Sequence, residues 1–230
     1  MDIHTSLYEG QHICLAPIDH DKDAEIESKW THDPEYLRLL DTAPARPLSA
    51  WQLKKKYEAI EKSAEEEKNS VYFTIRTRPS ESEPAERLVG FVQLQYIEWT
   101  NGNGHVRLGI GDPHDRRKGY GTEVLGLILR YAFCELNLYR LTAFIPEYNP
   151  AALRLFEKAG FVREVCRRQA LNRDGRRWDQ YGLGLLRDEW QSAVEKQPAV
   201  EQQPAVDNQP VTEQQPTVQN QPATGKQSES

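Results

Sequence analysis

Residues 116–122 read Arg116-Arg117-Lys118-Gly119-Tyr120-Gly121-Thr122 and lie between a strand-like run and a helix-like run. Glycine permits positive φ and close approach of the backbone to a ligand. The free N–H groups of such a loop and of the first helical turn can bind an anion. Three adjacent cations add positive charge at the same point. This segment, called the anion loop below, predicts a pyrophosphate site, with a basic surface loop before an ordinary helix as the alternative.

Two common phosphate-binding motifs do not fit the chain. No Gly-x-x-x-x-Gly-Lys-Ser/Thr stretch occurs, which excludes a P-loop. Gly109-Ile110-Gly111 lacks the spacing and the strand-to-helix junction of a dinucleotide fingerprint. The anion loop must therefore be interpreted from the elements around it.

Hydrophobic periodicity and turn residues predict the elements on both sides of the loop. The expected strands are 12–18, 71–75, 88–97, 105–110, 141–145, 161–171 and 178–186. The expected helices are 19–40 with a break at Asp33-Pro34, one beginning at a Ser49/Gln52 capping box, 119–136, and one capped by Asn149 and ended by Gly160. This order predicts an α+β (layered α/β) domain with a mixed, mostly antiparallel sheet of about seven strands flanked by helices.

The 230 residues divide by composition into two parts. Residues 1–195 have the composition of one globular domain. Residues 196–230 are rich in Gln and Pro and repeat every six residues, with proline in each repeat. Regular proline forbids helix and sheet, and the apolar content is too low to offset ordering entropy. We predict a disordered tail; a hexapeptide β-helix is the alternative.

Charge and cysteine content exclude several classes of protein. The net charge is −6, and a mildly acidic body argues against nucleic-acid binding. No window approaches a membrane span, and the N-terminus does not read as a signal peptide. Cys14, Cys134 and Cys166 are sparse and odd in number, which favours free, buried thiols in the cytoplasm and no metal site.

Two spaced motifs resemble those of the GNAT superfamily of N-acetyltransferases. Arg116-x-x-Gly119-x-Gly121 is similar to the family's Arg/Gln-x-x-Gly-x-Gly/Ala motif, which binds the pyrophosphate of acetyl-CoA. Residues 149–161, from Asn149 to Phe161, resemble its second signature. The run 178–190 is similar to the branch that acetylates ribosomal-protein alanine termini or small amines. The resemblance covers roughly residues 7–190.

The resemblance implies acetyl-CoA as co-substrate, with no metal. Amides of residues 117–122 would hold the pyrophosphate, Leu108 and Ile110 would pair with the pantetheine arm, and Asn149 would bind that arm or simply cap its helix. The implied cofactor-binding residues are Leu108, Ile110, Arg116, Arg117, Lys118, Gly119, Tyr120, Gly121, Thr122, Asn149 and Phe156.

The implied reaction moves an acetyl group to a primary amine, on a protein N-terminus or a small amine, by direct attack. The chain departs from the family at two positions: Phe156 replaces a tyrosine acid and Arg107 an acidic residue. Glu98 and His105 are the candidate bases, each with an alternative role as a surface or turn residue. A catalytically impaired CoA-binding regulatory module and a transferase of longer acyl groups stay open, as does a monomer or a homodimer.

Arginines cluster near the last predicted hairpin. They are Arg167, Arg168, Arg173, Arg176 and Arg177. The cluster would suit an acidic acceptor or the 3′-phosphate of CoA, and a solvated hairpin tip is the alternative.

Overall fold

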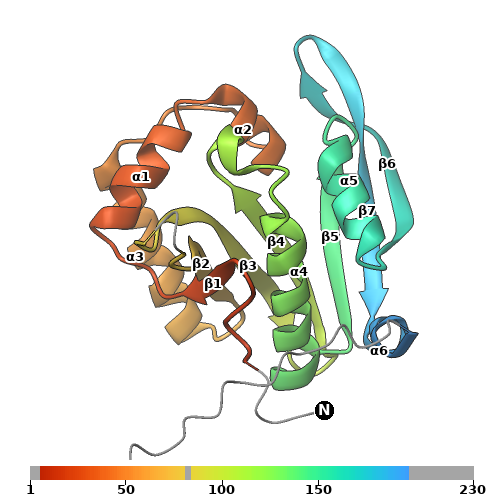
Figure 1. Ribbon diagram of the computed structural model, residues 1–230. Helices are drawn as coiled ribbons and strands as arrows, with labels where there is room; N and C mark the ends of the chain where they lie inside the picture. Colours follow the sequence, from red (N-terminus) through yellow and green to blue (C-terminus); the bar gives the residue numbers. More distant parts are fainter. Residues whose placement is uncertain (1–5, 81–83, 197–230) are drawn as a thin grey trace, which may run out of the picture. The chain divides into compact units, whose positions relative to one another are not determined.

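A seven-stranded mixed sheet with strand order β1-β2-β3-β4-β5-β7-β6 organises the computed structural model, which describes residues 6–80 and 84–196 (Figure 1). The strands are β1 (Ile13–Ala16), β2 (Val71–Thr77), β3 (Leu88–Glu98), β4 (Asn103–Ile110), β5 (Arg140–Pro146), β6 (Val162–Arg173) and β7 (Arg176–Leu186). Only β4 and β5 pair in parallel; the other neighbours are antiparallel. The predicted fold class is therefore confirmed.

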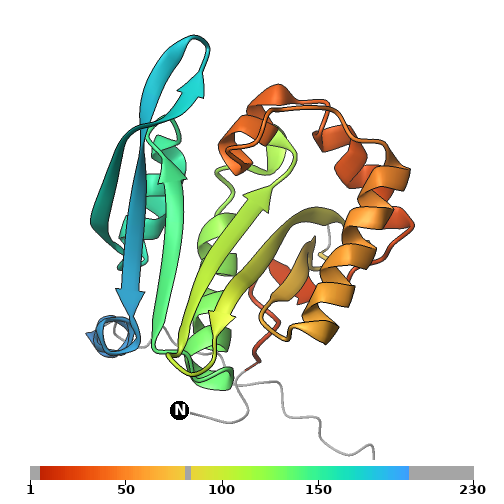
Figure 2. The same ribbon diagram turned by 180° about the vertical axis from the view of Figure 1, so that it is seen from behind.

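Helices cover both faces of the sheet, but unequally. They are α1 (Lys22–Trp30), α2 (Pro34–Leu40), α3 (Ala50–Glu66), α4 (Tyr120–Arg130), α5 (Pro150–Lys158) and α6 (Arg187–Lys196), with a 3-10 turn at Pro113–Asp115 and a π turn at Tyr131–Glu135. α4 and α5 lie on one face. α1 and α3 lie on the other, over the β1–β3 half; Figure 2 shows that no helix covers that face over β5, β7 and β6.

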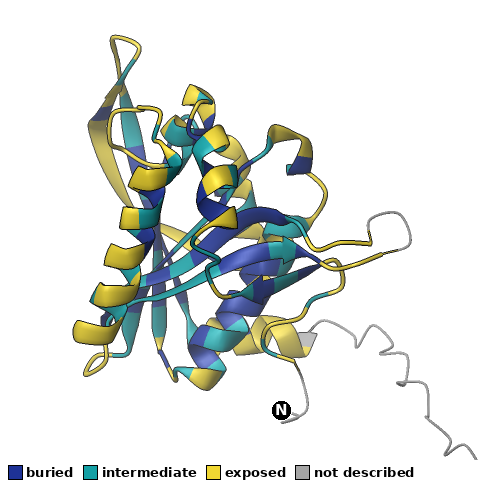
Figure 3. Ribbon diagram, turned by 90° about the vertical axis from the view of Figure 1, so that its left-hand side faces the viewer, coloured by how far each residue is buried: buried dark blue, intermediate teal, exposed yellow. Residues whose placement is uncertain are grey.

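Two apolar cores hold these layers together (Figure 3). The larger lies between the sheet and α4 and α5 and includes Ile128, Leu141 and Leu183, all fully buried. The smaller lies under α1 and α3 and includes Leu53 and Tyr57. Burial of these side chains is the main stabilising term of the fold.

Local signals in the sequence position the helix ends as expected. Ser49 and Gln52 form both hydrogen bonds of the predicted capping box. Asp33 caps α2 ahead of Pro34, and the Asn149 side chain caps α5 by accepting from the Ala152 amide. The break at Asp33-Pro34 is confirmed, because α1 ends at Trp30 and α2 begins at Pro34.

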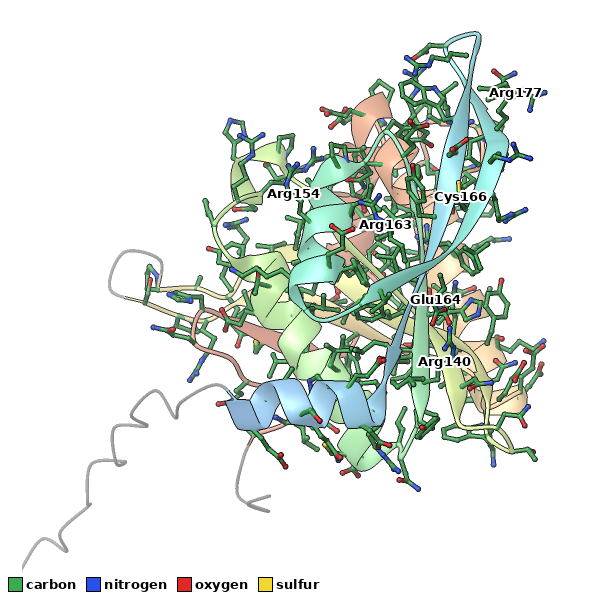
Figure 4. The ribbon with its side chains drawn as sticks, turned by 90° about the vertical axis from the view of Figure 1, so that its right-hand side faces the viewer. Arg140, Arg154, Arg163, Glu164, Cys166 and Arg177 are labelled. Carbon is green, nitrogen blue, oxygen red and sulfur yellow. The ribbon has the colours of Figure 1, made fainter. Side chains whose placement is uncertain are left out.

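Three sequence expectations need correction or fall outside the described residues. The helix expected over 119–136 ends as an α-helix at Arg130 and continues as the π turn. Cys166 is exposed rather than buried, because β6 is an edge strand that no element covers (Figure 4). α6 extends to Lys196, the first residue of the predicted tail, and the rest of that tail lies outside the described residues. Within the described residues, no helix is long and apolar enough to span a membrane.

Candidate functional site

The parallel pair β4–β5 opens along its length. The two strands pair over only three residues of each, ending at His105 and Thr142. Beyond that point β4 runs on to Ile110 and β5 to Pro146, each paired only with its other neighbour. The backbone groups of β4 that face the gap therefore have no strand partner and form a free edge to which an extended molecule can add.

A cavity of about 340 Å³ occupies this gap. Leu108 and Ile145 line it from the face that α4 and α5 cover. His105 and Phe144 line it from the opposite face. Successive residues of a strand point to opposite faces, so a cavity lined by both sets passes through the sheet. Two molecules that enter from opposite faces can meet inside it.

The anion loop lies directly before α4 and has its amides free. Gly119 has φ +90°, and Arg117 also has positive φ, at +65°. The amides of Thr122 and Glu123 donate to the Gly119 carbonyl at 3.0 and 3.1 Å. In the described chain, the amides of residues 117–121 donate no hydrogen bond to protein. No described residue lies within 4 Å of where a Cβ at Gly119 would stand, so the space beside Gly119 is open, and these amides could hold a pyrophosphate there.

Tyr120, Gly121 and Thr122 form the first turn of α4. A Cβ at Gly121 would stand 3.4 Å from Leu155 of α5, so the loop end lies close to the α5 surface. The positive end of the α4 dipole lies at this turn and favours an anion there.

Two of the three cationic side chains of the anion loop have partners within the protein. Arg116 donates to the Gly111 carbonyl at 3.2 Å and lies 3.7 Å from the Asp33 carboxylate. Lys118 donates to Asp115 at 3.1 Å. Arg117 forms no ion pair with any described residue. Arg116 and Lys118 therefore hold the loop in shape, and Arg117 is the cation of the three that is free for a ligand.

Asp115 connects the anion loop to the sheet. Its carboxylate is 3% exposed and receives two hydrogen bonds from Arg87, at 2.5 and 3.0 Å, besides the one from Lys118. Burial acts to raise the pKa of Asp115, but the hydrogen bonds from Arg87 and Lys118 outweigh it, so the pKa lies below its ordinary value. An ionised Asp115 thus fixes the turn that aims the loop amides.

The remaining predicted binding residues line the cavity or the apolar core next to it. Leu108 and Ile110 are partly buried on β4, and Leu108 lines the cavity. Asn149 accepts from Ala152 at 3.1 Å and donates to the Leu39 carbonyl at 3.2 Å, which leaves one N–H of its amide group for a ligand. Phe156 lines the cavity, is 4% exposed, and carries no proton to donate.

His105 lies at the point where β4 and β5 separate. Its ring packs between Tyr96 and Phe144, with centroid distances of 5.4 Å to each. Burial lowers the pKa of His105 below its ordinary 6.5, and the charge of Glu98 only partly opposes this shift. The imidazole is therefore neutral at pH 7 and able to accept a proton.

Glu98, the second candidate base, is the last residue of β3 and does not line the cavity. Its carboxylate accepts from Asn101 at 3.1 Å and from Asn103 at 3.3 Å. These hydrogen bonds, with Asn101 first, lower the pKa of Glu98 and keep it ionised. We carry only His105 forward as the base that can reach a reacting atom.

Several cavity residues were not singled out from the sequence. Gln95 and Gln180 line the cavity together with Asp41 and Thr42, from the loop after α2. Gln180 is a buried amide on β7, 6% exposed, and a buried polar residue in a strand was a signal available in the alternating pattern. Arg107, at the position where the family has an acid, donates to Asp41 at 2.8 Å and ties that loop to β4.

Comparisons with known proteins agree with this geometry. The family model for the "Acetyltransferase (GNAT) domain" matches residues 12–162. An N-acetyltransferase 9-like protein of Caenorhabditis briggsae is 33% identical over 141 residues, which cover 59% of this chain and 67% of that protein. The uncharacterized N-acetyltransferase YnaD of Bacillus subtilis is 33% identical over 79 residues, 34% of this chain and 46% of YnaD, so the chain spans less than half of that relative.

The fold also matches a solved structure. The crystal structure of spermidine N-acetyltransferase from Vibrio cholerae in complex with CoA and spermine superposes with a TM-score of 0.66 at 19% identity, over 78% of this chain and 98% of that one. This similarity concerns the fold. Because the family model spans more than half of the chain, the chain belongs to the GNAT family of acetyltransferases.

Proposed function

We propose that this protein transfers an acetyl group from acetyl-CoA to a primary amine, on a protein N-terminus or a small molecule. The observation that carries the proposal is the cavity through the sheet, with the free β4 edge on one face and His105 on the other. The donor's pantetheine arm would add beside Leu108 and Ile110, with its pyrophosphate on the anion loop. The acceptor would enter from the face on which His105 lies.

The reaction needs one base to deprotonate the amine and one hydrogen-bond donor to stabilise the oxyanion. The ammonium group must lose a proton before its nitrogen attacks the thioester carbonyl carbon, and the neutral His105 ring can take that proton. The neutral amine adds to the carbonyl carbon and forms a tetrahedral oxyanion. As this intermediate collapses, the C–S bond breaks, and the departing thiolate takes the second proton from the new amide nitrogen and leaves as the CoA thiol. A thiolate is a weak enough base to leave without help from a general acid, so Phe156 does not prevent turnover. A free N–H on the β4 edge would stabilise the oxyanion.

Release of free CoA thiol tests the proposal. Purified protein would receive acetyl-CoA with a panel of peptides bearing free N-termini, of polyamines and of small amines. We expect thiol release that requires both substrates, with one acetyl group on the amine per thiol by mass spectrometry. CoA binding without turnover on any amine would contradict the proposal and favour a regulatory module. Faster turnover of longer acyl thioesters would favour a different acyl donor.

A further inference from the structure

A second hollow adjoins the cavity on the acceptor side. It has a volume of about 420 Å³ and shares Thr42 and Gln180 with the cavity. The rest of its lining comes from the β6–β7 hairpin and includes Arg167, Arg173 and Arg177. None of the described residues that line it is acidic. A chain that leaves the cavity past Thr42 and Gln180 therefore runs into a strongly cationic site.

The charges of these arginines are not neutralised by the described residues. Arg167 donates to the Gln180 carboxamide at 2.8 Å, which is a neutral partner. Arg173 donates to backbone carbonyls of the loop after α2, at 2.6 Å to Thr42, and its buried Nε has no partner. The Arg177 side chain forms no ion pair or hydrogen bond within the described chain. Three guanidinium groups around one hollow favour an anion.

The carboxylates of the hairpin do not offset this charge. Asp174, at the tip, pairs with Arg38 at 3.1 Å. Asp179 accepts from the Gln169 amide at 2.8 Å and from the Cys166 thiol. Figure 4 shows Arg177 near the hairpin tip, with Cys166 lower on the outer strand. The hollow thus keeps its positive charge although acids occur close by in sequence.

We propose that the acceptor of this acetyltransferase is an acidic amine: a peptide N-terminus followed by Asp or Glu, or a small amine that carries a carboxylate. This inference rests on the proposed function, because it places the reacting amine in the cavity and the anionic group in the adjoining hollow. CoA cannot account for the same arginines. Its 3′-phosphate adjoins the pyrophosphate, which the anion loop would hold on the opposite face of the sheet.

The substrate class differs from that of a polyamine enzyme. A polyamine brings several positive charges along its chain, and these would meet Arg167 and Arg177 with like charge. A carboxylate in the hollow gains charge-assisted hydrogen bonds with the same groups. The sign of the charge beside the amine therefore decides whether a substrate is accepted.

Matched peptides test this inference. Three hexapeptides with free N-termini would differ only at residues two to four, which are Glu, Gln or Lys. We expect kcat/KM to fall in the order Glu, Gln, Lys, by roughly threefold to tenfold at each step. Raising the salt concentration from about 0.05 M to about 0.5 M should compress these differences, because surface charge is screened. Equal turnover of the Glu and Gln peptides would overturn the inference.

Substitutions of the arginines test whether the hollow is the source of the preference for the Glu peptide. Arg167→Gln and Arg177→Gln should each reduce the Glu-over-Gln preference roughly threefold, and Arg177→Glu should favour the Lys peptide. Arg168→Gln removes an exposed arginine of β6 that does not line the hollow and should leave the preference unchanged. CoA affinity should stay constant in all four. A preference that survives both Gln variants would place the selectivity elsewhere and overturn the inference.

A binding measurement separates this inference from the proposed function. Fluorescence anisotropy of the labelled hexapeptides on the CoA-loaded protein needs no turnover. Tighter binding of the Glu peptide with no acetylation would sink the proposed function and retain the anion site. Acetylation of the panel with equal binding of all peptides would retain the function and reject the anion site.

Discussion

The proposed donor side and the proposed acceptor side of this GNAT-family protein are built in different ways. The anion-binding part of the donor side is one short segment, residues 112–123, in which the loop, its stabilising acid and the helix start follow one another in the chain. The acceptor side brings together the loop after α2, residues of β3, β4 and β5, and the β6–β7 hairpin. Contacts such as Arg173 with Thr42 join residues more than a hundred positions apart.

Because of this difference, we expect substitutions on the two sides to affect binding in different ways. In the proposed function the anion loop binds through backbone amides, so its role depends on conformation and on open space rather than on side-chain chemistry. The proposed acceptor side would bind and react through side chains, those of His105 and the arginines of the hairpin. Backbone-directed changes should therefore affect the donor, and side-chain changes the acceptor. The predictions below test that division.

The largest effect is expected from Gly119→Glu. The new carboxylate would occupy the open space over the loop amides, where the pyrophosphate would lie, and its backbone would be strained at φ +90°. Juxtaposed like charges cost several kcal/mol, so we expect CoA affinity to fall at least about a hundredfold by calorimetry.

Gly126→Glu is the matched control for that substitution. Gly126 is exposed on the same helix and also has nothing within 4 Å of its would-be Cβ. CoA affinity should be unchanged in this variant. Equal loss of affinity in both would mean that net charge, and not the loop, determines binding.

His105→Gln should lower kcat by about a hundredfold and leave CoA affinity unchanged, because it removes a base without touching the donor side. The pH profile adds a second test. Since burial lowers the pKa of His105, the wild-type rate should be lost only as pH falls below the ordinary 6.5, and this acid limb should vanish in the variant. His32→Gln, at an exposed histidine outside the cavity, is the control. An unchanged acid limb in His105→Gln would exclude the ring as the base.

The same contrast explains which parts of the fold and of the candidate site can be predicted from the sequence alone. The individual strands, the caps at Ser49 and Asn149, and the anion loop depend on neighbours in the chain, so periodicity and motif spacing indicated them. Gln180 and Thr42 meet only through the fold, and no local pattern brings them together. The exposure of Cys166 follows from the edge position of β6, which strand order decides and the strand's own residues do not.

Asp115→Asn should destabilise the anion loop, because it removes the carboxylate that holds the loop in place. The amide keeps one acceptor oxygen but loses the negative charge that pairs with Arg87 and Lys118, so we expect unfolding free energy to fall by about 2 kcal/mol at pH 7. The pKa of Asp115 is lowered in the fold, so its stabilisation is present above the ordinary 3.8 and is lost as pH falls through the folded value. The gap between wild type and variant should close at acid pH, as measured by urea titration.

The CoA affinity of the Asp115→Asn variant shows whether the conformation of the anion loop or its positive charge contributes more to CoA binding. We expect roughly a tenfold loss, because the loop amides are no longer held in place. Affinity equal to or above wild type would mean that the released Lys118 charge matters more than loop conformation. Asp188→Asn, at an exposed acid of α6, should change neither stability nor affinity.

The smallest effect is expected at Asn149, where donor and acceptor sides meet. Its side chain caps α5 and also donates to the Leu39 carbonyl at the end of α2. Asn149→Ser keeps a capping oxygen and loses the donor, whereas Asn149→Ala loses both. Losing the cap should cost about 1 kcal/mol in the Ala variant, and the Ser variant should retain most of that stability. If the free N–H also binds the pantetheine arm, both variants should lose about threefold in acetyl-CoA affinity. A loss confined to the Ala variant would assign Asn149 to the helix cap alone.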